Sequence, residues 1–198
     1  MHRVRDETEI YTNYLLSEFE QLNAVSDAYR GKAVDEDLIE SIVMYLIFMY
    51  LNGFDATALM LRESADEPTA AEISKSVYAD VGGKDVDDRL RELLGMTFED
   101  AEGKIDDIIR SDGHRLYVLG QAALARAVSE KGIRLKKKWD TTMDGKERRT
   151  HHKLDGVEKD VGDVFETYLG NKAQAPGQFG VPEEDCNCRC ILRYIKIS

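Results

Sequence analysis

Cysteine and histidine side chains gather in the C-terminal half of the sequence, where they could bind a metal ion. Cys186, Cys188 and Cys190 fall within five residues, and His151 and His152 are adjacent. Thiolate sulfur and imidazole nitrogen are zinc ligands, so Cys188, Cys190 and His151 form a candidate zinc site, with Cys186 or His152 as a fourth ligand. The alternative is that Cys188 and Cys190 are small buried hydrophobic residues on a final strand. The cysteine spacing is closer than structural zinc sites usually have, so we expect no cofactor, with zinc as the alternative.

The same residues could also perform acid–base or nucleophilic catalysis. His151 and His152 could exchange protons with a substrate. Asp144 or Asp155 would orient the imidazole, and Cys188 could act as a nucleophile. Such a group would make the protein a metal-dependent or Cys/His hydrolase, for example a nuclease-like toxin. The sequence has no phosphate-binding loop and no dinucleotide-binding motif, so we expect a protein that is not an enzyme and has no small-molecule substrate.

The charge is distributed unevenly along the sequence. The formal net charge is −11, which disfavours nucleic-acid binding over the whole surface. Residues 131–153, however, contain nine Lys or Arg and three Asp or Glu, a net charge of +6. This segment is either a solvated basic surface or a contact with DNA or an acidic partner. The candidate DNA-contacting residues are Arg134, Lys136, Lys137, Lys138 and Arg149, together with Arg148.

Cysteine usage indicates a reducing compartment, and hydropathy predicts neither a secretory signal nor a membrane span. Three closely spaced cysteines do not predict a disulfide framework, and reduced thiols fit a cytoplasmic protein. The first nine residues are charged and lack the apolar core of a secretory signal. The most apolar run, residues 42–51, is too short to span a bilayer. We therefore expect no membrane association and a location in the cytoplasm of the cell that makes the protein.

Hydrophobic periodicity predicts an α+β fold, with a helical region over residues 1–97 and a small α+β module over residues 98–198. The helix starting near Asp35 is apolar on most sides and should lie at the centre of a bundle. Asn52–Gly53 is expected to kink or end it, and Gly113 and Gly120 weaken the prediction of a long helix further on. The expected helices cover residues 7–29, 35–51, 54–62, 69–78, 86–94 and 98–130.

After Gly132 the pattern changes to short elements. Residues 133–140 alternate as a strand, with Lys137 and Trp139 on one side. We predict that Trp139 packs with the segment from Cys188 to Cys190. The other expected elements are a short helix over 147–154, a strand or turn over 163–169, a polar loop over 170–187 and a β-rich end over 190–197.

A local polar network is expected next to Trp139. We predict that Asp144, Arg148 and His151 tie the connecting segment to the rest of the module. If residues 147–154 are helical, then Arg148, His151 and His152 share one face. Gly156 would then permit a sharp exit from the helix.

The order of residues from Trp139 to Cys190 resembles the Mu-F-like phage head morphogenesis, or minor capsid, family. The resemblance covers residues 100–195. Lys146 departs from it where the family usually has a second Arg, and Cys186 extends the usual two-cysteine ending. Arg110-Ser111-Asp112 resembles the family's Arg-Thr-Glu-like helix start. The other matched positions are Trp139, Asp144, Arg148, His151, Leu154, Gly156, Val164-Phe165, Pro176-Gly177 and Cys188-Arg189-Cys190.

The resemblance implies a component of the phage head. Members of this family are minor, non-enzymatic parts of the procapsid, often associated with the portal and sometimes with DNA delivery. We therefore expect portal or other head proteins as partners, DNA as a further partner, and a location in the virion or the bacterial host cytoplasm. Some members carry a toxin domain after this module. Because eight residues follow Cys190, no such domain is expected here.

Overall fold

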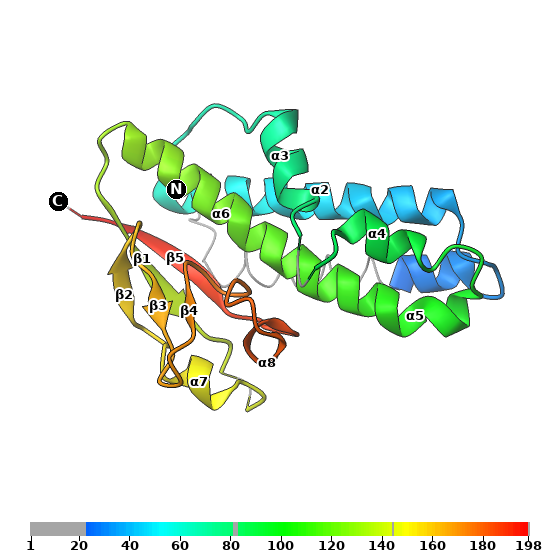
Figure 1. The fold of residues 1–198 in the computed structure, drawn as a ribbon. Helices are drawn as coiled ribbons and strands as arrows, with labels where there is room; N and C mark the ends of the chain where they lie inside the picture. Colours follow the sequence, from blue (N-terminus) through cyan, green and yellow to red (C-terminus); the bar gives the residue numbers. More distant parts are fainter. Residues whose placement is uncertain (1–22, 81–82, 144, 198) are drawn as a thin grey trace, which may run out of the picture.

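Helices form the N-terminal part of the protein, and short strands with two helical turns form the C-terminal part (Figure 1). The structure is a computed structural model that describes residues 23–80, 83–143 and 145–197. The predicted α+β fold is confirmed. Of the helix expected over residues 7–29, residues 23–29 are helical, and the remainder lies outside the described residues.

The central helix is α2, Glu36–Leu61, which runs without interruption for 26 residues. The Asp35 carboxylate accepts a hydrogen bond from the backbone N–H of Leu38 (2.9 Å) and so satisfies one donor of the first turn. The helix ends at Arg62, whose backbone is left-handed (φ 51°). The expected kink or end at Asn52–Gly53 is wrong, because tertiary packing of an apolar face outweighs weak local propensity.

The length of α2 changes the interpretation of its apolar composition. By length and composition alone, the whole of α2 could cross a membrane, although its most apolar run, residues 42–51, is too short to do so. Half of its most apolar stretch is buried inside the structure, and α6 is the helix that it contacts most extensively. Burial on several sides is also what the central helix of a bundle shows, as the sequence predicted.

Two shorter helices, α3 (Ala70–Val77) and α4 (Val86–Arg91), pack against α2 (Figure 1). α3 begins with a capping box. Thr69 Oγ1 accepts a hydrogen bond from the Glu72 N–H (3.3 Å), and the Glu72 carboxylate accepts one from the Thr69 N–H (2.8 Å). α4 ends earlier than expected, and turns follow it.

The helical run expected over residues 98–130 consists of α5 (Phe98–Asp107), the π-helix η1 (Ile108–Asp112) and α6 (Gly113–Glu130). Thr97 caps its N-terminus, since its hydroxyl accepts a hydrogen bond from the Asp100 N–H (3.3 Å). The π-helical turn was not predicted. Arg110, at which the sequence resembles a helix start of the family, lies inside η1 with helix on both sides, so no helix begins at this residue.

α2 and α6 pack with their backbones in contact at two glycines. A Cβ atom added at Gly120 would lie 1.9 Å from the carbonyl oxygen of Tyr50. One added at Gly53 would lie 1.9 Å from the carbonyl oxygen of Tyr117. Any side chain at either position would force the helices apart, so these glycines permit close packing that offsets their weak helix propensity.

The C-terminal sheet has the order β2-β1-β5, and both pairs are antiparallel. Its strands are β1 (Leu135–Asp140), β2 (Glu158–Asp160) and β5 (Ile191–Lys196). A second ladder pairs β3 (Phe165–Glu166) with β4 (Lys172–Ala173). Two helical turns complete the module, α7 (Arg149–His152) and α8 (Pro182–Asp185). Thus α7 is shorter than expected, and the segment expected to be a loop contains β4 and α8.

The helices and the sheet share one core. Buried residues of α2, α6, β1 and β5 belong to a single hydrophobic cluster. Gln121, fully buried on α6, donates a hydrogen bond from Nε2 to the carbonyl oxygen of Leu192 on β5 (3.0 Å). α6 thus packs between α2 and β5, and α2 also contacts β5 directly. The division into residues 1–97 and 98–198 stays a prediction.

Candidate functional site

Trp139 lies at the centre of the C-terminal core. It is on the inner face of β1, and its exposed fraction is 0%. Its indole contacts the rings of His151, Phe165 and Phe179 at centroid distances of 5.4, 5.1 and 5.8 Å. This burial agrees with the predicted packing of Trp139 with the segment from Cys188 to Cys190. The segment from Cys188 to Cys190 belongs to the same core, although it precedes β5 rather than forming part of that strand.

His151, Cys188 and Cys190 form a compact buried cluster beside Trp139. His151 Nδ1 lies 3.6 Å from Cys188 Sγ and 3.4 Å from Cys190 Sγ. The three atoms all lie within 4.8 Å of one another. Two thiols and an imidazole in this arrangement can hold a metal ion or share protons through hydrogen bonds.

The other edge of the His151 imidazole faces a buried carboxylate. Its Nε2 lies 3.2 Å from Oε2 of Glu184, an ion-pair distance, although the N–H direction does not meet hydrogen-bond geometry. Glu184 is 2% exposed. It accepts hydrogen bonds from the Thr150 hydroxyl (2.7 Å) and the Asn171 side-chain amide (3.1 Å). These donors hold the carboxylate in place, so groups on both edges orient the imidazole.

The two buried cysteines have different pKa values. The hydrogen bond from the Cys188 thiol, with a further contribution from His151, lowers the pKa of Cys190 below its ordinary value, although burial opposes this shift. The hydrogen bond to Cys190 and burial raise the pKa of Cys188. The pair therefore favours one thiolate, on Cys190, and one thiol, on Cys188.

Cys186 and His152 lie outside this cluster, so the prediction that one of them supplies a fourth metal ligand is wrong. Cys186 is exposed, and its carbonyl oxygen accepts a hydrogen bond from Arg148. His152 is exposed, and its Nδ1 lies 3.6 Å from Oε1 of Glu147. Successive residues in a helical turn point about 100° apart. For that reason His152 cannot face the core together with His151. The prediction that Arg148, His151 and His152 share one helix face is therefore also wrong.

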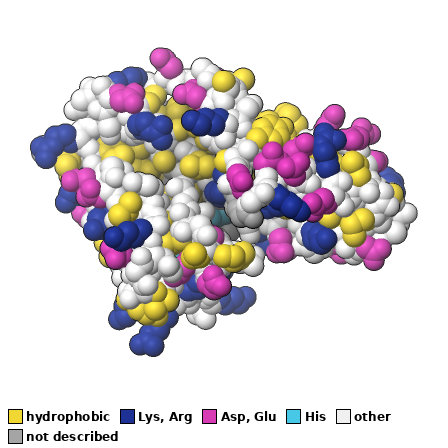
Figure 2. Space-filling view, viewed as in Figure 1, with side chains coloured by type: hydrophobic (Ala, Val, Ile, Leu, Met, Phe, Trp, Pro, Cys, Tyr) yellow, Lys and Arg dark blue, Asp and Glu magenta, His cyan; other side chains and the backbone are white. Residues whose placement is uncertain are grey.

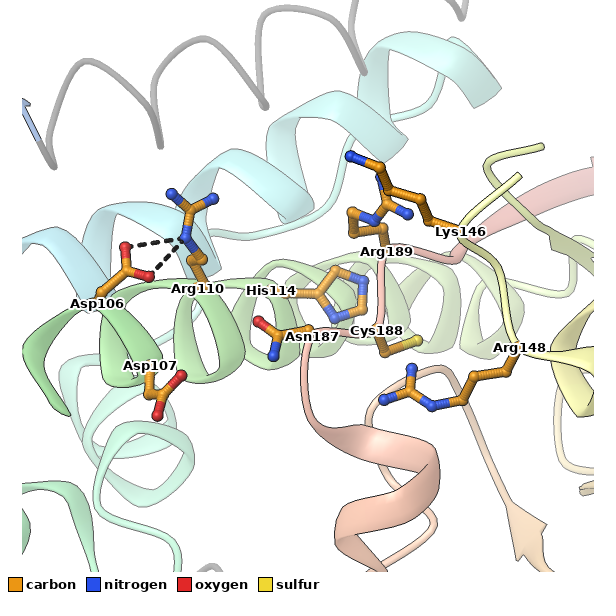
Figure 3. A pocket seen from close by; sticks show the side chains of 9 residues that line it. All are labelled: Asp106, Asp107, Arg110, His114, Lys146, Arg148, Asn187, Cys188 and Arg189. Carbon is orange, nitrogen blue, oxygen red and sulfur yellow. Dashed lines mark hydrogen bonds and ion pairs between the residues drawn. The ribbon is translucent and has the colours of Figure 1, made fainter. Parts of the chain in front are cut away.

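A pocket of about 600 Å³ opens beside Cys188 (Figure 3). Arg110, on its wall, donates from Nε to both carboxylate oxygens of Asp106 (2.9 and 3.0 Å). Asp144, the third member of the predicted polar network, lies outside the described residues, so that network stays a prediction. The pocket is lined by Asp106, Asp107, Arg110, His114, Lys146, Arg148, Asn187, Cys188 and Arg189.

His114 is a buried residue of this region that the sequence interpretation missed. Its Nε2–H donates to the carbonyl oxygen of Cys190 (2.6 Å), and burial lowers its pKa. A Cβ atom added at Gly177 would lie 3.4 Å from His114 Nδ1. Pro176 is buried next to this glycine. His114 therefore links the Pro-Gly loop to the Cys-Arg-Cys segment, and the one sequence signal for it was a histidine within an otherwise apolar helical stretch.

The chain leaves α7 through a tight turn at Gly156. This glycine has a φ of +76°, and its N–H donates to the carbonyl oxygen of Trp139 (2.9 Å). The Thr141 N–H donates to the Asp155 carboxylate (2.9 Å), and Leu154 is buried beneath the turn. The predicted sharp exit at this glycine is confirmed.

The candidate DNA-contacting residues do not form one continuous face. Lys137 is 2% exposed, and its Nζ donates to the backbone and side-chain oxygens of Gln174 (2.8 Å each). The prediction that Lys137 contacts DNA is therefore wrong, because strand alternation turns its side chain toward the core. Lys136 and Lys138 are half-buried opposite acidic residues of β2, and Lys and Arg are interspersed with Asp and Glu on the face in Figure 2. The exposed members are Arg134 and Arg149.

Comparison with known proteins finds similarity over residues 70–193, which include the cysteine and histidine cluster. The family model described as Phage Mu protein F like protein matches residues 70–193. Minor head protein GP7 of Bacillus phage SPP1 is 30% identical over 126 residues, which are 64% of this chain and 39% of that protein. The NAD(+)--arginine ADP-ribosyltransferase EFV of Enterococcus faecalis (strain ATCC 700802 / V583) is 54% identical over 61 residues, 31% of this chain and 12% of that protein. The chain thus spans less than half the length of these relatives, and no solved structure matches it.

Proposed function

Because the chain belongs to the Phage Mu protein F like family, we propose that it takes part in procapsid assembly as a minor, non-enzymatic component of a phage head. The observation that carries this proposal is the similarity to Minor head protein GP7 over 64% of the chain. Its partners would be other head proteins, with the portal as the first candidate. Its location would be the host cytoplasm during assembly and the virion afterwards.

The burial of five of the matched residues supports a structural role. Trp139, His151, Leu154, Cys188 and Cys190 are all buried. Together they hold α7 and the segment before β5 against the sheet. Their side chains are used in packing and internal hydrogen bonds, as suits a module that serves as an assembly part.

An exposed apolar turn suits contact with another head protein. Tyr168 and Leu169, between β3 and β4, are 59% and 65% exposed. With Val181 and Glu183 they line a pocket of about 420 Å³. Exposed aromatic and aliphatic side chains beside a pocket are typical anchors for a protein partner.

Mass spectrometry of procapsids and mature heads from the phage that encodes this chain tests the proposal. We expect the wild-type chain in procapsids, in fewer copies than the major capsid protein. A variant with Tyr168→Ser and Leu169→Ser should fold normally but be incorporated less. Tyr78→Ser, at a position that is 43% exposed, is the matched control and should be incorporated as wild type. Absence of the wild-type chain from every head intermediate would contradict the proposal.

DNA contact is a separate part of the proposal. If Arg134, Lys136, Lys138 and Arg149 neutralise phosphates, affinity for duplex DNA should fall steeply with salt, because each contact releases counterions. Alanine at these four positions should weaken binding and reduce the salt dependence. Binding that ignores salt, or no binding, would restrict the partners to proteins.

The hydrolase alternative is weakened by the geometry. His152 points away from His151 and Cys188, so the three proposed catalytic side chains do not meet. The activity in the name of the Enterococcus faecalis relative is that protein's, of which the match covers 12%. Nuclease activity that is present in the wild type and lost in His152→Ala would favour the hydrolase. We expect no nuclease activity in the wild type or in the variant.

A further inference from the structure

We propose that His151, Cys188 and Cys190 bind one zinc ion through Nδ1 and two sulfur atoms, with a water molecule as the fourth ligand. This site goes beyond the role in head assembly, because it concerns how the C-terminal module is held together. It also differs from the site expected from the sequence, since Cys186 and His152 have no part in it.

The two distances from His151 Nδ1 to the cysteine sulfurs fit tetrahedral coordination. Zinc binds thiolate sulfur at about 2.3 Å and imidazole nitrogen at about 2.0–2.1 Å, so tetrahedral angles place nitrogen and sulfur about 3.5 Å apart. The two His151 Nδ1 to Sγ distances are 3.6 and 3.4 Å. A zinc ion could therefore enter with little movement of these side chains.

The His151 imidazole has a carboxylate beside its second nitrogen, as metal-bound histidines usually do, although the N–H direction does not meet hydrogen-bond geometry in this structure. Metal-binding imidazoles usually direct their second nitrogen at a carboxylate or carbonyl, which sets the tautomer and orients the ring. Here Nε2 lies 3.2 Å from the Glu184 carboxylate, which Thr150 and Asn171 hold by hydrogen bonds. With the proton on Nε2, the lone pair of Nδ1 points toward the two sulfurs.

Space for a fourth ligand and a path to the site are both present. A cavity of about 20 Å³ is lined by Thr141, Arg148, His151, Asn187 and Cys190, among others, and this volume is enough for about one water molecule. Cys188 lines the larger pocket of about 600 Å³. In Figure 3 its side chain lies at the wall of that pocket, near Arg148, so an ion could arrive from this side.

Zinc at this position would connect two segments that are distant in sequence. His151 belongs to α7, and the cysteines immediately precede β5. Apart from the six-residue strands β1 and β5, the module consists of strands of two or three residues and helices of four residues, which have little stability of their own. A metal that binds only the folded arrangement contributes its binding free energy to folding.

Zinc content, measured by mass spectrometry of the reduced and reconstituted full chain, tests the proposal. We expect one zinc ion per chain in the wild type and in the matched control Cys186→Ser. Cys188→Ser and Cys190→Ser should lose the ion and the rise in Tm that zinc produces. Cobalt(II) in place of zinc should show thiolate-to-metal charge transfer and the strong d–d absorption of four-coordination. A wild type without zinc, or equal loss in Cys186→Ser, overturns the proposal.

A measurement on the wild type guards against variants that fail to fold. Bound zinc should protect Cys188 and Cys190 from alkylation while Cys186 is modified at the same rate with and without zinc. Glu184→Gln should retain one zinc ion but bind it about 10–100-fold more weakly, because the histidine loses its charged partner. Equal alkylation of all three cysteines with and without zinc, or a Cys188–Cys190 disulfide that persists under reduction, overturns the proposal.

Discussion

The helix pair α2–α6 and the core around Trp139 are stabilised in different ways. α2 and α6 are long, contact each other along much of their length, and bury mainly aliphatic and aromatic side chains. The C-terminal core consists of elements as short as two residues, which surround one indole and are joined by side-chain hydrogen bonds to backbone groups. In the helix pair the critical positions carry the smallest side chain, glycine, whereas in the C-terminal core the critical position carries the largest.

This difference shows how element length sets the demand on single residues. A long helix makes many equivalent contacts, so only positions of backbone contact are restrictive. Short strands and turns make few backbone hydrogen bonds of their own, so particular side chains must supply the remaining stability.

The largest effect is expected from Gly120→Ala. The added Cβ would lie 1.9 Å from the Tyr50 carbonyl oxygen, so α2 and α6 must separate. We expect a loss of about 4–5 kcal/mol or more in the free energy of unfolding, measured by urea denaturation. The control is Gly103→Ala in α5, where nothing lies within 4 Å. That substitution should stabilise the protein by up to about 1 kcal/mol. Equal effects of the two would show that the glycine contact is unimportant.

Trp139→Ala should remove about 3–5 kcal/mol, because it leaves a large cavity in the C-terminal core. Near-UV circular dichroism and urea denaturation would detect the loss. Trp139→Phe should cost less, since the buried indole Nε1 has no hydrogen-bond partner among the residues that the structure describes. Lys136→Ala on the outer face of β1 should change little. A small effect of Trp139→Ala would contradict the assignment of this residue as the centre of the module.

Gln121→Leu tests the connection between the two regions. The Gln121 side chain donates to the carbonyl of Leu192 (3.0 Å) and accepts from its N–H (3.4 Å). Removing it leaves buried backbone groups of β5 unpaired, at a cost of about 2–3 kcal/mol. Ser129→Ala on the same helix breaks only a bond within α6 and should cost far less. Hydrogen exchange of β5 amides should rise in the first variant, and unchanged exchange would argue that β5 is held by β1 alone.

The smallest effect concerns Lys137 and depends on pH. Burial lowers the pKa of Lys137 to about 8, with partial opposition from Asp163. The unfolded chain, with an ordinary lysine pKa of about 10.4, therefore binds more protons, and stability should rise with pH between these two values. Relative to Lys137→Met, the wild type should gain about 1–2 kcal/mol between pH 8 and about pH 10. A difference that does not vary with pH would show that the ammonium is well solvated.

Several parts of the fold could be predicted because their signals are local. The side chains of Asp35, Thr69 and Thr97 each accept a hydrogen bond from an N–H three residues ahead, so the sequence alone marked these helix starts. The alternation of β1 indicated the burial of Trp139. It also places Lys137 on the same buried side, which is inconsistent with the expected contact of Lys137 with DNA. The order of residues from Trp139 to Cys190 was sufficient for the family resemblance.

The tertiary structure alone decided which distant residues meet. Nothing in the sequence near Gly53 or Gly120 shows that a carbonyl of the facing helix lies against it. The sequence could not choose between His151 and His152, because the choice depends on the rotation of α7 when it packs against Trp139. Glu184 and His114 joined the cysteine cluster from α8 and α6, and short-range patterns carry no signal for such approaches. Local hydrogen bonds and side-chain periodicity act within a few residues, whereas the packing of whole elements determines the contacts of the site.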